Sequence, residues 1–193
     1  MRQIKLIIAM LVVITPTLAF GDLIGFEGLA DGTVITNQFA GVVFSANAGF
    51  ENQVTTQPGI GFGDNFICTA AIGQGINCVE ETILTFTGLV NNLTFWEVGV
   101  NDSGLVALVD VFVNSVFSAT VNIFGFSTPF TPSLVDLSGF SNVSSIRIYN
   151  VTDTAGIGWD NFEFVTQVPE PGTLALLGIG LFGMGLARRR KTV

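Results

Sequence analysis

Apolar and polar positions alternate along much of the chain between residues 21 and 167, with the period of two that is typical of β-strands. In 105–113, Leu105 and every second residue after it are apolar, and Asp110 falls on the opposite face. The turn sequence Asn-Asp-Ser-Gly at 101–104 precedes this segment and predicts a hairpin. The other expected strands are 23–27, 42–46, 82–87, 93–100, 115–124, 144–151 and 157–165, with a long loop at 57–77. We therefore predict an all-β fold, a single antiparallel β-sandwich of jelly-roll type.

The amino end has the organisation of a secretory signal peptide. Arg2 and Lys5 precede an apolar run at 6–14, and small residues follow at the positions that a signal peptidase reads. We expect a signal peptide helix over residues 1–19, with cleavage after Ala19 or after Gly21. The β-sandwich domain then spans 20–167.

The carboxyl end has three parts in a fixed order. A short polar motif is formed by Val168, Pro169, Glu170, Pro171 and Gly172. An uncharged apolar segment at 173–187 follows, and as a helix its roughly 15 residues would reach about 22 Å, less than the bilayer core. A basic stop is formed by Arg188, Arg189, Arg190 and Lys191, whose charges favour the cytoplasmic side. We predict a transmembrane helix at 173–187 that holds the chain in the inner membrane transiently.

These three parts together resemble the PEP-CTERM sorting signal of Gram-negative bacteria that make exopolysaccharide and biofilm. The resemblance covers 168–191 and implies that a membrane protease of the exosortase type recognises Pro169, Glu170 and Pro171 and removes the tail. It also implies export to the cell surface or the extracellular matrix. An ordinary single-helix anchor is the alternative interpretation.

The charge of the segment between the two ends excludes nucleic acid as a partner. From residue 20 to residue 167, Arg147 is the one cation against fourteen acidic residues, a net charge of −13. A single cation cannot neutralise the phosphates of a nucleic acid. Most of its carboxylates must therefore be solvated or bind a metal ion.

Two cysteines, Cys68 and Cys78, lie in the segment expected to be exported. An oxidising compartment makes a disulfide between them the expected state. The chain contains no histidine, so a zinc site or a Cys/His nucleophile cannot be built.

A second, weaker resemblance concerns the domain itself. Residues 26–29, 42–45 and 157–162 together resemble sandwich domains of PEP-CTERM proteins, which are similar to carbohydrate-binding modules. In such modules an acid near the first strand and an aspartate opening the last often share a structural calcium ion, and Glu27 and Asp160 occupy similar places. Strand parity puts Asp160 on the face of Phe162, toward the interior, whereas Arg147 faces outward. Either Ca²⁺ binds Glu27 and Asp160, or Asp160 caps a turn through backbone N–H groups.

The side chains expected on the outer face of the last two strands suggest a carbohydrate-binding patch. If the last two strands pair, their outer faces would present Arg147, Tyr149, Trp159, Asn161 and Glu163. Flat aromatic rings with polar neighbours suit the two sides of a sugar ring. The alternative is that this face packs under a loop or against the second sheet.

The predicted function is that of a non-enzymatic, exported protein with a structural or adhesive role in exopolysaccharide or biofilm. The first alternative is a calcium-dependent carbohydrate-binding module. The second is a polysaccharide-acting enzyme, which would need two carboxylates across a cleft.

Overall fold

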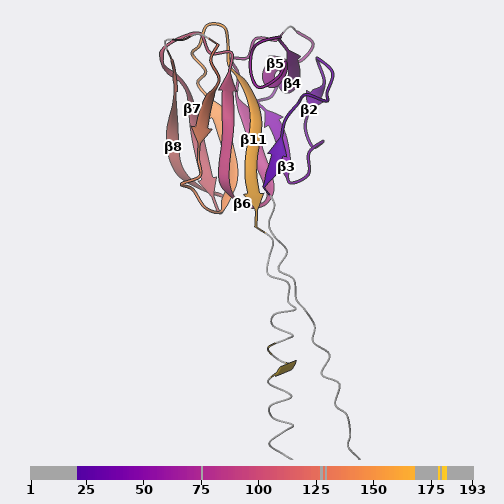
Figure 1. Ribbon diagram of the computed structural model, residues 1–193, viewed down its shortest axis with the longest axis vertical. Helices are drawn as coiled ribbons and strands as arrows, with labels where there is room; N and C mark the ends of the chain where they lie inside the picture. Colours follow the sequence, from indigo (N-terminus) through magenta and orange to yellow (C-terminus); the bar gives the residue numbers. More distant parts are fainter. Residues whose placement is uncertain are drawn as a thin grey trace, which may run out of the picture.

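The computed structural model describes residues 21–74, 76–126, 128, 130–167, 178, 180 and 181. Eleven strands in this part of the chain join in one antiparallel sheet (Figure 1). They are β1 (Asp22–Ile24), β2 (Val34–Ile35), β3 (Val42–Ala46), β4 (Phe50–Thr56), β5 (Asn65–Ala71), β6 (Thr82–Val98), β7 (Gly104–Val113), β8 (Val116–Gly125), β9 (Ser133–Asp136), β10 (Val143–Tyr149) and β11 (Gly158–Thr166). The sheet order is β2-β4-β5-β11-β6-β10-β7-β8, with β1 added on β11 and with β3 and β9 added on β6. The predicted all-β, antiparallel fold class is confirmed.

The long strand β6 connects the two halves of the sheet. Its first half pairs with β3 and β10, and its second half pairs with β9 and β11. The sequence predicted two strands here, separated by a turn at 88–92, and that separation is wrong. Val90 is fully buried and pairs with both Val143 and Thr166, and Asn92 adopts a left-handed φ of 53° within the strand. The Gly and Asn residues therefore lie inside one continuous strand that serves both halves.

The core is one large cluster of aliphatic and phenylalanine side chains drawn from both halves of the sheet. Phe162 lies at its centre, stacked on Phe95 at a centroid distance of 5.2 Å and edge-on to Phe26 and Phe44. A smaller cluster of Ile60, Phe66, Cys68 and Val98 lies beside it. All strands and both clusters fall within residues 21–167, which we call the body and expect to fold as a unit.

A bulge at Asn161 shifts the parity of the last strand. Asn161 has a φ of 46°, and the register of β11 with β6 shifts between Asp160 and Glu163. Trp159, Phe162 and Phe164 consequently all point into the large core. The prediction that Asp160 shares a face with Phe162 is wrong, because one extra residue reverses the alternation.

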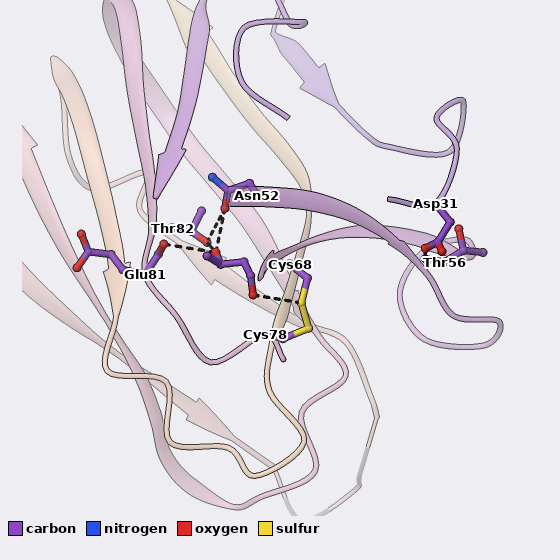
Figure 2. Close-up of a disulfide and its surroundings, with 8 residues drawn as sticks. Asp31, Asn52, Thr56, Cys68, Cys78, Glu81 and Thr82 are labelled. Carbon is purple, nitrogen blue, oxygen red and sulfur yellow. Dashed lines mark hydrogen bonds between the residues drawn. A yellow bond between two sulfur atoms is a disulfide. The ribbon is translucent and has the colours of Figure 1, made fainter. Parts of the chain in front are cut away.

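The disulfide between Cys68 and Cys78 is confirmed, with a Cα–Cα distance of 4.9 Å (Figure 2). Cys68 lies on β5, a strand within the segment that the sequence predicted to be loop. Beside the disulfide, the buried hydroxyls of Thr69 and Thr82 both donate to Asn52 Oδ1, at 2.9 and 3.1 Å. This polar cluster links β4, β5 and β6 next to the covalent bond.

The two predicted end segments fall largely outside the described residues. These are the signal peptide at 1–19 and the sorting segment at 168–191, of which Gly178, Gly180 and Leu181 are described and are helical. Within the part of the chain that the structure describes, no helix is both long and apolar enough to cross a membrane.

Candidate functional site

The loop between β4 and β5, residues 57–64, is held by two carboxylates. Glu27 accepts the backbone N–H of Asn65 on Oε1 at 3.1 Å and that of Asp64 on Oε2 at 3.3 Å. A Cβ atom at Gly63 would collide with the Glu27 carboxylate, so a larger residue there would displace that carboxylate from its present position. Asp160, only 2% exposed, accepts the N–H of Asn161 on Oδ1 at 2.7 Å and a backbone hydrogen bond from Phe62. Two segments distant in sequence thus fix this loop through backbone amides.

The electrostatics of Asp160 follow from its burial. Burial raises the pKa of the Asp160 carboxyl from 3.8 to about 6, the hydrogen bonds from Asn161 and Phe62 oppose that rise, and the negative charge of Glu27 adds to it. The backbone N–H groups that Asp160 accepts are of the kind expected if Asp160 caps a turn. Among the described residues, no group of three or more His, Cys, Asp or Glu side chains is arranged to hold a metal ion. Calcium would need further oxygen ligands from carbonyl groups or water, and its binding stays a prediction.

The five residues of the predicted sugar patch do not come together. Trp159 is 1% exposed and packs edge-on against Phe95 in the large core. The last two strands do not pair, because β6 lies between β10 and β11 in the sheet order. Asn161 is half-buried at the bulge, and Glu163 is exposed on β11. The expected outer-face position of Trp159 is wrong, because the bulge turns it inward.

Arg147 and Tyr149 do lie on the outer face of β10, where they form a polar cluster. The Arg147 guanidinium lies 2.5 Å from Glu81 and 3.9 Å from Asp110, with its carbon 4.5 Å from the centroid of the Tyr149 ring. The hydroxyls of Tyr149 and Thr120 donate to Asp110 Oδ1 at 3.2 and 2.6 Å. The hydrogen bond to Glu81 raises the pKa of Arg147 above its usual range. The one cation of the body is thereby neutralised internally, beside a hollow of about 360 Å³ that Asn47 and Asn150 help to line.

A cleft between β8 and β9 contains an acidic residue that sequence reasoning missed. Glu97 on β6 is 1% exposed, and its Oε2 has no hydrogen-bond partner in the described part of the chain. Burial raises its pKa from 4.5 to about 7, while a hydrogen bond with Ser133 lowers it and the charge of Asp153 adds to the rise. The cleft has a volume of about 290 Å³, and Asp136 and Asn122 also line it. Strand parity, which places Glu97 on the face of Phe95, was the one signal that could have identified it.

An aromatic hollow adjoins this cleft on the outer side of β9. Trp96 and the exposed side chains of Phe126 and Leu134 line it, together with the hydroxyls of Thr131 and Ser133, in a volume of about 530 Å³. Phe62 covers another part of the indole at a centroid distance of 4.3 Å. Trp96 itself is half-buried and packs against the smaller cluster.

Comparison with known proteins identifies the carboxyl end. Residues 167–191 match the model of the PEP-CTERM protein-sorting motif, which confirms the resemblance of the three-part tail. No curated protein matches the chain. Among solved structures, the chain has a distant similarity to CBM51-2 in complex with GlcNAc and INT domains from Clostridium perfringens ZmpB, with 16% identity and a TM-score of 0.32. That match covers 75% of this chain and 32% of the other, so the chain spans about a third of that structure's length.

Proposed function

We propose that this chain, which carries a PEP-CTERM protein-sorting motif, is an exported protein with a structural or adhesive role in the exopolysaccharide or biofilm matrix. An exosortase-type membrane protease would remove the tail after the motif Val168, Pro169, Glu170 and Pro171. The body would then work, without catalysing a reaction, at the cell surface or in the extracellular matrix of a Gram-negative bacterium. The match of residues 167–191 to the sorting motif is the observation that carries the proposal.

Three features of the chain support this proposal. The Cys68–Cys78 disulfide fits an oxidising compartment. A signal peptide at 1–19 would direct the chain into the export pathway. The sheet, which we interpret as a jelly-roll-like sandwich folded around one core, is fixed by carboxylates that cap loops, as Glu27 and Asp160 do.

The sorting route can be tested in the host with two epitopes, one in the body and one after the basic stop. In the native chain the two epitopes should separate, with the body outside the cell. Glu170→Ala in the motif should keep both epitopes on one membrane-bound chain. Glu163→Ala, on the exposed face of β11, is the matched control and should be processed normally. Processing of the Glu170→Ala chain at the native rate would refute exosortase recognition.

A calcium-dependent carbohydrate-binding module is the alternative, supported by the proximity that lets the charge of Glu27 raise the pKa of Asp160. Binding of Ca²⁺ to the folded state alone would raise the melting temperature by mass action. The measurement is the melting temperature of the body in millimolar calcium and after chelation. Equal values would remove calcium from this site.

A polysaccharide-acting enzyme is the second alternative, and one observation favours it. Glu97 and Asp136 line the same cleft, and a carboxyl with a pKa of about 7 is suited to general-acid chemistry. Release of reducing ends from host polysaccharide by the native body, and its loss in the Glu97→Gln variant, would support this function. No release by the native body would count against it.

A further inference from the structure

The free edges of the sheet differ greatly in how well they are protected. The sheet order ends at β2 and at β8. The strand β2 has two residues, and the added strands β1, β3 and β9 have three, five and four. The strand β8 has ten residues and pairs along its length with β7 alone among the described strands (Figure 1). Its other edge therefore presents a long row of backbone N–H and C=O groups.

The strand β8 also lacks the usual devices that prevent edge pairing. Proteins blunt long edges with charged residues, proline or very short strands. No charged residue and no proline occurs between Val116 and Gly125, in a body with a net charge of −13. A bulge at Ser118 disturbs one end of the strand, but residues 119–123 pair with β7 without interruption. This half of β8 is a regular, uncharged edge.

Large exposed apolar side chains lie at the two ends of this strand. Val116 is 67% and Phe117 54% exposed at its start, and Phe124 is 54% and Phe126 57% exposed at its end. Exposed apolar side chains of this size favour contact with another molecule.

We propose that β8 is a self-association edge, where a second copy of this chain adds its own β8 in antiparallel orientation about a twofold axis. The inference deepens the proposed structural role, on which its biological meaning rests. Antiparallel pairing is the pattern of every strand pair in the sheet. A twofold axis near Val121 would place Ala119 opposite Ile123 of the second copy on the inner face. On the outer face it would place Thr120 opposite Asn122.

The pattern of β8 is complementary to itself. About the twofold axis the exposed Val116 of one copy would lie opposite the exposed Phe126 of the other, and no charged side chain of the strand would meet a like charge. The surroundings of the strand are acidic, because Glu97 and Asp136 line the cleft beside it. Salt should therefore favour the contact by screening the repulsion between the two copies.

The test is sedimentation equilibrium of the exported body over a wide concentration range at low and physiological salt. We expect a reversible monomer–dimer equilibrium that tightens with salt. Asn122→Lys places a cation in the middle of the edge and should raise the dissociation constant at least about tenfold. Ala48→Lys, in the exposed turn between β3 and β4, makes the same change in net charge and should leave the constant within about twofold.

Hydrogen exchange of the native body provides a measurement that needs no variant. Amides on the free side of β8 should become protected as the concentration rises, and those of β2 should not. A body that stays monomeric at every concentration and salt would overturn the proposal. So would a dimer that Asn122→Lys leaves intact, or one that forms without protection of β8. A failure of sorting would appear instead as an uncut tail in cells, so the two failures are distinguishable.

Discussion

The buried carboxyl of Glu97 predicts that the body loses stability as the pH rises. Its pKa is about 7 in the folded chain against 4.5 ordinarily, so the folded state binds its proton more tightly than the unfolded state does. Between these two values the folded state holds more protons, and stability falls with increasing pH. The difference of about 2.5 corresponds to a total cost of about 3 kcal/mol above pH 7.

The substitution Glu97→Gln removes this titration and keeps the shape of the side chain. The loss expected from Glu97 between pH 5 and pH 8 is about 2.5 kcal/mol. The free energy of unfolding of the variant, relative to that of the native body, should therefore rise by about 2.5 kcal/mol from pH 5 to pH 8. Asp160, whose pKa is about 6, contributes a decline in the same direction that both proteins share, so it cancels in the comparison.

The assay is urea unfolding of the native and variant bodies at several pH values from 5 to 8, with free energies compared at each pH. Glu163→Gln, the same change at an exposed position of β11, is the control and should not alter the difference between pH 5 and pH 8. A constant free-energy difference between Glu97→Gln and the native body over the whole range would refute the reasoning.

The remaining predictions concern the disulfide, a glycine and a buried loop acid. Replacing Cys68 and Cys78 by serine should cost about 3 kcal/mol, because the bond closes a loop with a sequence separation of 10, and urea unfolding under non-reducing conditions measures this cost. Gly125→Ala should lower the melting temperature by several degrees, since its Cβ atom would collide with the carbonyl of Asp102, whereas Gly139→Ala, which meets open space, should change it by under about one degree. Asp153 is 1% exposed and accepts the N–H groups of Asn101, Asp102 and Ala155, so Asp153→Ala should cost at least about 3 kcal/mol in the same unfolding assay; a cost below about 1 kcal/mol would contradict it.

Alternation along the chain was enough to predict the regular strands. The predicted strand at 42–46 coincides with β3, and 105–113 coincides with β7 apart from one residue. β3 follows the period of two from end to end, so burial alone fixes its register. In β7 Ala107, Val109 and Val111 are buried as predicted, whereas Leu105 is exposed because the register with β8 shifts between Leu105 and Ala107. The disulfide was equally predictable, because the chain has only two cysteines and a separation that a short loop can close.

The candidate site could not be predicted because two asparagines adopt backbone conformations that the sequence does not signal. A left-handed Asn161 reversed the parity of β11, which moved Trp159 into the core and Asp160 toward the β4–β5 loop. A left-handed Asn92 let β6 continue where turn residues suggested an end. Asparagine tolerates this region better than most residues, but nothing local requires it. Glu97 was missed because burial of an acid depends on its neighbours in space.

The position of β11 determines where mechanical force enters the protein. Its hydrogen bonds run to β6 on one side and to β1 and β5 on the other, so the last strand before the tail lies inside the sheet. Tension applied through the carboxyl end must break bonds on both flanks of that strand. Tension at the amino end would meet only the three residue pairs of β1 and could peel them away. The last strand, β11, is therefore harder to detach from the sheet by force than the first strand, β1.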